Sequence, residues 1–234
     1  MELGPKIIFQ VGPLNITETM IWGWIITAVI LVFVFASTRR MERVPRGAQA
    51  WAELLVETVY KMVESTMGKE NLKFAPYIGT LLCFLGLGSM LGLLDCRPVT
   101  ADLNTTVPLA LVTFVMVHYN GIRQNSLRGY MKKKASPYAA MMPMTLLDDL
   151  FFPVTLAMRL FGNILAGVIV MTLVYGGLES LSQALGSAVP FLQLVIPLPL
   201  NFFFDMFEPV LQSYIFVMLT MVFTSNAMER PMEA

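Results

Sequence analysis

Long apolar stretches alternate with short charged ones along this chain, and each stretch is long enough to cross a lipid bilayer. A crossing helix needs about 20 apolar residues, because the hydrocarbon core is about 30 Å thick and a helix rises about 1.5 Å per residue. The pattern predicts five such helices, at residues 20–37, 74–95, 105–122, 146–177 and 190–226. We therefore expect an all-α integral membrane protein that forms one membrane domain, residues 1–234.

Residues 47–67 follow a different pattern, in which apolar and charged side chains occupy opposite faces of one helix. The apolar positions recur at helical spacing and are Trp51, Leu54, Leu55, Val59, Met62 and Val63. The charged positions are Glu53, Glu57, Lys61 and Glu64. A helix of this kind rests on the membrane interface with its apolar face down. The segment therefore predicts a surface helix, with a short soluble hairpin arm as the alternative.

The last two spans are longer than a bilayer requires. Residues 150–178 form about 43 Å of helix at about 1.5 Å per residue, so this helix is expected to tilt. The final span contains four prolines, which predict a broken entrance and a kink before a regular helix; they are Pro190, Pro197, Pro199 and Pro209. The two helices are expected to form a long, tilted hairpin.

Amino-acid composition excludes several classes of function for this chain. Charged residues make up 14% of the chain, hydrophobic residues make up 56%, and the formal net charge is zero. Such a chain has no broad basic surface for nucleic acid and is too apolar to be disordered. Two cysteines and one histidine exclude a disulfide framework and a multi-histidine metal site. Because the nucleotide and hydrolase motifs GxxxxGK[ST], GxSxG and HExxH are also missing, we expect neither an enzyme nor a bound cofactor or metal.

Basic residues in the loops predict the orientation. With five crossings, thirteen of the sixteen Lys and Arg residues fall on one side, in segments 38–73 and 121–147 and in the C-terminal tail. The other side has only Lys6 and Arg97. Cytoplasmic loops carry the excess of basic residues, so the N-terminus is expected outside and the C-terminus in the cytoplasm. This bias is typical of a bacterial plasma membrane, and an organelle derived from a bacterium would share it.

The sixteenth basic residue, Arg159, lies inside the fourth span. An arginine stays charged at any physiological pH and is costly in hydrocarbon, so it must meet an anion or water, or snorkel to the surface. Asn163 lies one turn away on the same helical face. Nearby Gly162, Ala166 and Gly167 are small enough to let another helix approach, and simple packing explains them equally well.

The last span carries a second polar face. Asp205, Glu208 and Gln212 are spaced i, i+3 and i+7, which places two carboxyls and an amide on one side of a helix. Desolvated carboxyls exchange protons near neutral pH, so this stripe suits an ion path. The alternative is that the two acids are merely solvated at the outer helix end. His118 is interpreted as an interfacial anchor rather than a proton relay.

One stretch resembles a known signature. Pro153-Val-Thr-Leu-Ala-Met-Arg159-Leu-Phe-Gly-Asn163-Ile-Leu-Ala-Gly167 is similar to the signature of subunit a of F-type ATP synthases, the ATPase subunit 6 family. The stretches Pro98–Asn104 and Leu211–Thr220 resemble the family's loop before a span and its last-helix motif. Order, spacing and hydropathy fit over about residues 15–228.

The resemblance implies a role in the Fo motor. Subunit a is the stator part of that motor, and two half-channels within it carry H⁺ or Na⁺ to and from the carboxylates of a rotating c-subunit ring. Its other partners are the peripheral-stalk subunit b, the rest of the F1Fo complex and membrane lipid. By similarity, Arg159 faces the ring, and Asn163 and Gln212 flank the ion path. Asp205 matches a position that is ionisable in other members.

The resemblance also marks secondary residues and departures. Asp149 falls where many members have a glutamate, and Asp102 and Asn104 belong to the family's loop, so these three are possible secondary path or loop residues. Val168 stands where many members carry Glu or His, so the path must use Asp205, Glu208 or water. Apart from the resemblance, two alternatives remain: a secondary transporter in which Arg159 binds an anionic substrate, and an assembly protein with no ion path. The chain lacks the paired halves of many transporters.

Overall fold

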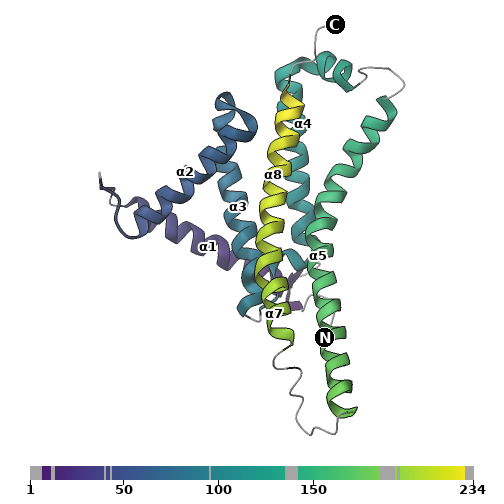
Figure 1. Ribbon diagram of the computed structural model, residues 1–234. Coiled ribbons are helices and arrows are strands. Elements are labelled where there is room, and N and C mark those ends of the chain that lie inside the picture. The colour runs from purple at the N-terminus through teal and green to yellow at the C-terminus, as the bar shows by residue number, and fades with distance from the viewer. Residues whose placement is uncertain are drawn as a thin grey trace.

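The computed structural model describes residues 7–229 except 12–13, 40, 43, 95, 135–141, 185–192 and 194–195. In this part of the chain, two strands precede a series of helices (Figure 1). The elements are β1 (Ile7–Val11), β2 (Leu14–Thr17), α1 (Glu18–Thr38), α2 (Ala48–Met67), η1 (Lys69–Phe74), α3 (Ala75–Ser89), η2 (Met90–Leu94), η3 (Val99–Ala101), α4 (Leu103–Lys134), α5 (Met142–Ala184), α7 (Pro197–Phe202), η5 (Phe203–Phe207) and α8 (Glu208–Met228).

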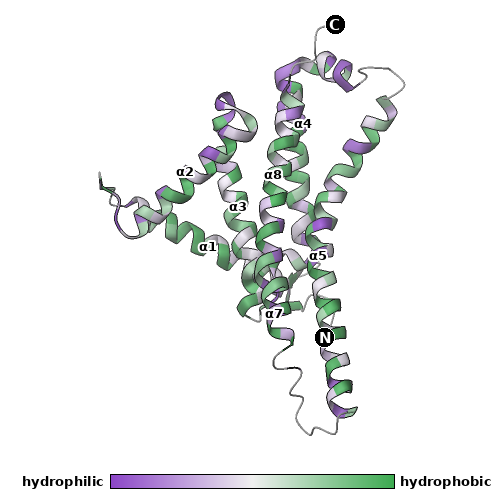
Figure 2. Cartoon of the chain, in the orientation of Figure 1, coloured by the Kyte–Doolittle hydropathy of each residue, from purple (hydrophilic) through white to green (hydrophobic). Residues whose placement is uncertain are grey.

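Within the described ranges, five helical segments are long and apolar enough to cross a membrane, which confirms the predicted fold class. They are Glu18–Thr38, Lys69–Leu94, Leu103–Lys134, Met142–Ala184 and Pro197–Met228. Each contains most or all of one predicted span. Figure 2 shows these helices as largely hydrophobic along their middles, with hydrophilic residues concentrated toward the upper ends of α2, α4 and α5.

A short antiparallel β hairpin precedes α1, which the hydropathy pattern did not predict. Strands β1 and β2 pair with Phe9 opposite Ile16 and Gln10 opposite Asn15, with an irregularity between Ile7 and Phe9. A pair of strands four or five residues long buries too little surface to give a clear signal in the sequence, and such hairpins are marginal without support from neighbouring elements. Here β2 leads directly into α1, whose first residue is Glu18.

Helix α2 forms where the amphipathic pattern predicted it, but its apolar face is divided between two environments. Val59 and Val63 near its C-terminus are buried against α3 and α8. Trp51 and Leu54 near its N-terminus remain 71% and 56% exposed. On the outer face, Lys61 pairs with Glu57 at 2.7 Å, and this contact lowers the pKa of the Glu57 carboxyl. The location of α2 on a membrane surface remains a prediction.

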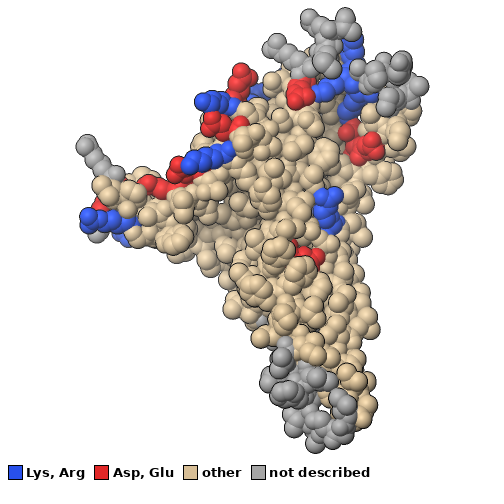
Figure 3. All heavy atoms as spheres, in the orientation of Figure 1, with Lys and Arg blue, Asp and Glu red and all other residues tan. Residues whose placement is uncertain are grey.

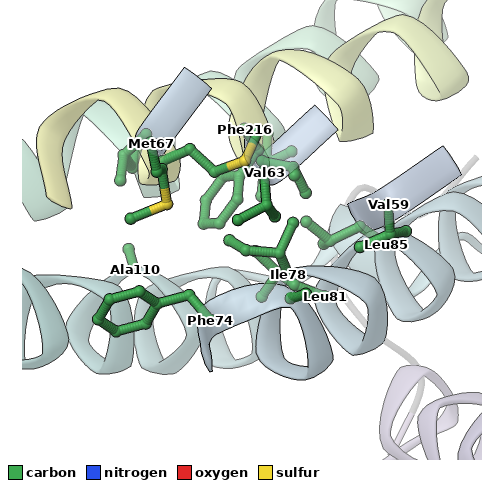
Figure 4. Packing of buried hydrophobic residues seen from close by; sticks show 14 of the residues in the cluster. Val59, Val63, Met67, Phe74, Ile78, Leu81, Leu85, Ala110 and Phe216 are labelled. Carbon is green, nitrogen blue, oxygen red and sulfur yellow. The ribbon is translucent and has the colours of Figure 1, made fainter. Parts of the chain in front are cut away.

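Helix α8 is the centre of the main hydrophobic core. Its buried positions recur every three or four residues and are Ser213, Phe216, Val217, Thr220, Met221, Thr224 and Met228. Phe216 packs with Val63 of α2 and Ile78 of α3, as Figure 4 shows. The threonine hydroxyls in this row donate to carbonyls four residues earlier, so they are buried without losing their hydrogen bonds.

Small side chains bring α4 close to its neighbours. Before residue 126, its buried positions all share one face and are Thr106, Ala110, Thr113, Val117 and Gly121. A side chain at Gly121 would lie 2.8 Å from the Tyr130 ring and 3.2 Å from the Ala227 carbonyl oxygen. Helices in lipid associate through such small residues, because close packing takes the place of the hydrophobic effect between them.

Helix α4 continues well past the span predicted at 105–122. Its backbone breaks at Ser126, where φ is 60°, and then runs on to Lys134. The bent segment folds over the end of α8: Asn125 Nδ2 donates to the carbonyl oxygens of Ala227 and Glu229 at 3.0 and 3.1 Å. Lys133 contacts carbonyls at the same end. These contacts satisfy the last carbonyls of α8 and place a cation at the negative end of its dipole.

Asp102 joins the start of α1 to the start of α4. Its carboxylate is 4% exposed and accepts hydrogen bonds from the Thr19 hydroxyl at 2.8 Å and the Thr17 hydroxyl at 3.3 Å. It also accepts from the backbone N–H of Asn104 at 3.0 Å, which caps α4. This buried carboxylate therefore fixes the short helix η3 that precedes it.

Replacing Asp102 with alanine is expected to lower stability by about 2 kcal/mol, because it removes a cap and the shared acceptor of the Thr17 and Thr19 hydroxyls, of which only one can then donate to the other. The melting temperature of the detergent-solubilised full chain should fall by about 4–8 °C. Asp148→Ala is the control, because Asp148 is exposed on α5. An equal melting temperature for the two variants would show that the hydrogen bonds of Asp102 do not stabilise the fold.

Candidate functional site

A small cavity lies where α3, η3, α5, η5 and α8 meet. Polar side chains from four of these elements line it, namely Ser89, Thr100, Asn163, Glu208 and Gln212. Apolar walls complete it with Leu160, Ile164, Phe204 and Pro209. About 10 Å³ is open to the centre of a water molecule, which is close to the space that one water needs. The cavity thus brings together three of the five residues predicted for the ion path.

Two polar atoms at this cavity are buried without a hydrogen-bond partner in the described part of the chain. They are Gln212 Oε1 and Thr100 Oγ1. A buried polar group without a partner costs about 1–3 kcal/mol, so proteins keep such groups mainly for binding water, ions or substrate. The neighbouring Ser89 and Ser213 hydroxyls do have partners, since they lie 3.2 Å apart and Ser213 also donates to the Pro209 carbonyl at 2.8 Å.

Arg159 lies beside the cavity without lining it. The guanidinium belongs to the partly exposed middle of α5, one residue before Leu160 in the cavity wall. No carboxylate among the described residues forms an ion pair with it. On the face in Figure 3, a broad uncharged region carries one isolated basic side chain, with acidic atoms below it. The two residues predicted to share a helical face therefore have different surroundings. Asn163 lines the cavity with residues of α8, whereas Arg159 is partly exposed at the surface of α5.

The two acids of the last span have different neighbours. Glu208 begins α8 and lines the cavity with Gln212. Asp205 lies against η2 instead, where a side chain added at Gly92 would come within 3.3 Å of its Oδ1. The stripe predicted from the spacing i, i+3, i+7 therefore splits between two surfaces.

A π-helical turn explains why the stripe splits. Residues Phe203–Phe207 form one wider turn between α7 and α8, and Pro209 follows it at the second position of α8. Proline lacks an N–H, so the regular hydrogen-bond ladder cannot continue through it. A π turn shifts the helical register by one residue, and such turns are frequent at functional sites. The kink predicted from the prolines remains a prediction, and this π turn is where it would lie.

The secondary residues lie away from the cavity. Asp102 caps α4, as described above, and Asn104 is exposed in the first turn of that helix. Asp149 is near the other end of α5, where its carboxylate contacts Lys134 Nζ and lies 3.7 Å from His118 Nε2. Among the described residues, no group of three His, Cys, Asp or Glu side chains could hold a metal ion.

Ser89 and Thr100, which help line the cavity, were not predicted as site residues from the sequence. Both lie close to chain turns, Ser89 at the end of α3 and Thr100 in η3. Single hydroxyl residues are common in membrane helices, where they bond to their own backbone, so neither stood out from its neighbours. For Thr100 a signal did exist, because it lies in the fragment Pro98–Asn104 that resembles the family's loop motif. That resemblance did not indicate that the loop lines a cavity.

Comparison with known proteins identifies the family to which this chain is similar. The sequence pattern of the ATP synthase A chain family matches residues 20–225. An ATP synthase subunit a from Moorella thermoacetica is 32% identical over 223 residues, covering 95% of each chain. ATP synthase subunit a 2 from a Bradyrhizobium species is 32% identical over 226 residues, covering 96% of this chain and 95% of that one. ATP synthase subunit a 1 from Hahella chejuensis is 33% identical over 229 residues, covering 96% and 90%.

The matched region contains all five candidate spans in large part, together with Arg159 and the whole cavity lining. All three relatives are bacterial, and each match extends over at least nine-tenths of both chains. The chain therefore belongs to the ATP synthase subunit a family, as a multi-pass, non-catalytic subunit of the Fo membrane sector.

Proposed function

We propose that this subunit provides two offset half-channels, which carry H⁺ or Na⁺ to and from the carboxylates of a rotating c-subunit ring and so drive rotation and ATP synthesis. The observation that carries the proposal is the polar cavity beside Arg159. Its lining residues Asn163, Glu208 and Gln212 come from two candidate membrane-spanning helices, next to an arginine that forms no ion pair with a described carboxylate.

The chemistry of Arg159 suits an encounter with a moving carboxylate. A cation within about 4–6 Å lowers the pKa of a carboxyl, so a ring carboxylate that reaches Arg159 must release its ion. Once past, it enters lipid, where a charge is costly, and it must first bind another ion. The guanidinium also repels cations, so it blocks a direct leak between the half-channels. Moving one charge through 100 mV provides about 2.3 kcal/mol, so several ions are needed per ATP.

An open helical face next to Arg159 supports contact with the ring. Gly162 and Ala166 follow Arg159 at i+3 and i+7, which places all three on one side of α5. A side chain added at Gly162 would meet no atom of the described residues within 4 Å, and Ala166 is exposed. A surface of small residues lets a second helix approach closely in lipid. Packing inside this chain therefore accounts for Gly167, but not for Gly162.

The cavity is assigned to the outer half-channel and the opposite end of α5 to the cytoplasmic one. With the N-terminus outside, α4 ends and α5 begins at the cytoplasmic surface. The titratable residues His118, Lys134 and Asp149 gather there and are candidates for the inner path. Basic side chains in Figure 3 concentrate at the upper end of the molecule and on the arm at the left, which supports this orientation. Subunit b, the remaining F1Fo subunits and membrane lipid are the other proposed partners, in a bacterial plasma membrane.

Replacing Gln212 with leucine tests the path without removing the arginine. The change keeps the side chain's size but removes its buried amide, so an ion in the cavity loses one hydrogen bond worth about 1.5–3 kcal/mol. Ion flux through the reconstituted complex should therefore fall by about tenfold to a hundredfold. Flux is measured from the decay of a potential imposed across proteoliposomes.

The matched control for this experiment is Leu211→Ala. Leu211 precedes Gln212 on α8 but is 40% exposed and does not line the cavity. This control should leave the flux near the native rate. Native flux in the Gln212 variant, with assembly intact, would remove the cavity from the ion path.

A further inference from the structure

Helix α5 and the α7–α8 segment run antiparallel and meet in three successive layers. The first layer is the cavity, where Asn163 faces Glu208 and Gln212. The second is a contact between Gly167 and the Phe204 ring. The third is a hydrogen bond of 2.8 Å from Asn201 Nδ2 to the Tyr175 hydroxyl oxygen. Figure 1 shows α5 running down toward the level of α7 and beyond it, to the end that the proposed orientation places outside.

The third layer has polar capacity beyond its own hydrogen bond. Both residues are only partly exposed, and they sit on helices that are otherwise apolar at this level. The Tyr175 oxygen accepts from Asn201, so the phenolic O–H is still able to donate, and the Asn201 carbonyl oxygen is still able to accept. A donor and an acceptor held side by side in this way provide both kinds of hydrogen bond that a water or hydrated cation needs.

The second layer is an apolar barrier. A side chain at Gly167 would lie 3.2 Å from Phe204 Cδ1, so the ring rests almost directly on the α5 backbone. The same ring lines the cavity on its other side. Phe204 also belongs to the π-helical turn, and such turns are frequent at functional sites. An aromatic ring between two polar layers restricts water and ions, as hydrophobic constrictions in channels do.

We propose that Tyr175 and Asn201 form the outer mouth of the half-channel, and that Phe204 on Gly167 is the apolar gate between this mouth and the Gln212 cavity. Ions pass from the aqueous side to the hydroxyl–amide pair and then, when the ring moves aside, to the cavity. This inference rests on the function proposed above. It assigns the positioning of ions to Tyr175 and Asn201, and control of access to Phe204.

Chemical labelling of cysteines tests the mouth. Single cysteines are introduced into the full chain in the assembled complex, after Cys83→Ser and Cys96→Ser, and a membrane-impermeant cationic methanethiosulfonate is applied from outside. Because only a hydrated thiol ionises and reacts, Asn201→Cys should react at least about tenfold faster than Phe202→Cys. Phe202 is the control because it is adjacent and 59% exposed on the apolar surface. If Asn201→Cys prevents assembly, Tyr175→Cys replaces it. Equal rates, or no reaction at either tested mouth position, would overturn the proposal that Tyr175 and Asn201 form the outer mouth.

The proposed Phe204 gate is tested by measuring how fast a cysteine in the cavity behind it is labelled. Gln212→Cys should react slowly with the same reagent, and adding Phe204→Ala should raise its rate by about tenfold or more, because the barrier to the hydrated reagent is removed. Phe207→Ala is the matched control from the same π turn, with a ring that is 53% exposed and does not line the cavity. An unchanged rate, or an equal rise with Phe207→Ala, overturns the gate. If both labelling tests fail while Gln212→Leu still slows ion flux, only this inference falls, and the proposed function stands.

Discussion

Replacing Arg159 with alanine is expected to abolish ion-driven ATP synthesis in reconstituted complexes, with a loss of at least about a hundredfold, while the complex still assembles. The reason is that no Lys or Arg is among the residues that line the cavity, so none of them can take over its charge. Without it, a ring carboxylate keeps its ion as it crosses between the half-channels. The change converts coupled transport into a passive leak, because the cation that separated the two paths is gone. A two-pKa-unit loss of differential binding corresponds to about 2.7 kcal/mol, or about a hundredfold.

The measurement pairs ATP synthesis with passive ion conductance in the same proteoliposomes. Synthesis should disappear while conductance persists or rises. Arg128→Ala is the control, because Arg128 is exposed on the bent end of α4 and should be silent. Arg159→Lys distinguishes charge from geometry, because lysine keeps the charge but lacks the planar fork that binds a carboxylate through two hydrogen bonds. Retained synthesis in Arg159→Ala would refute the assigned role of this arginine.

Replacing Gly162 with leucine is expected to stop rotation-coupled synthesis without unfolding the subunit. A side chain at this position meets no atom of its own chain within 4 Å, so the fold should tolerate it. On the proposed ring-facing surface, however, four extra carbon atoms would hold a neighbouring helix away from Arg159. Synthesis should fall at least about tenfold, because a misplacement of about 1 Å can already reduce a reaction rate by about a hundredfold.

Gly86→Leu is the matched control for this surface. Gly86 lies on α3, and a side chain there also meets nothing within 4 Å. Both variants should give the native melting temperature in detergent, and only the Gly162 variant should lose synthesis and ring association by cross-linking. Normal synthesis in Gly162→Leu would mean that the open face of α5 does not contact the ring.

Much of the architecture follows from local patterns that are readable in the chain. Lipid requires every backbone polar group to be paired within a helix, so an apolar window of about 20 residues is almost sufficient to define a span. The prediction was weaker at the ends of helices. The third span extends through a bend at Ser126 to Lys134, because that segment caps α8 through Asn125 and Lys133, a contact with residues about a hundred positions away.

The candidate site was predictable in its composition but not in its geometry. Asn163, Glu208 and Gln212 were identified from a lone arginine, a helical stripe and a resemblance, and they do meet in one cavity. Asp205 was assigned to the same stripe and lies elsewhere, because the π turn before Pro209 changes the register. Asp102 was expected in a loop and is a buried helix cap, since its hydroxyl partners come from a segment more than 80 residues earlier.

The sequence by itself determined which segments cross the membrane and which polar side chains are costly enough there to indicate function. Both depend on hydropathy and spacing within one helix, which are local quantities. Only the tertiary structure decided which polar groups face one another: that Ser89 and Thr100 join the cavity, that Phe204 rests on Gly167, and that Gly162 stays open. Those relations depend on how α3, α5 and α8 rotate and pack together, and packing is the joint result of side chains far apart in the chain.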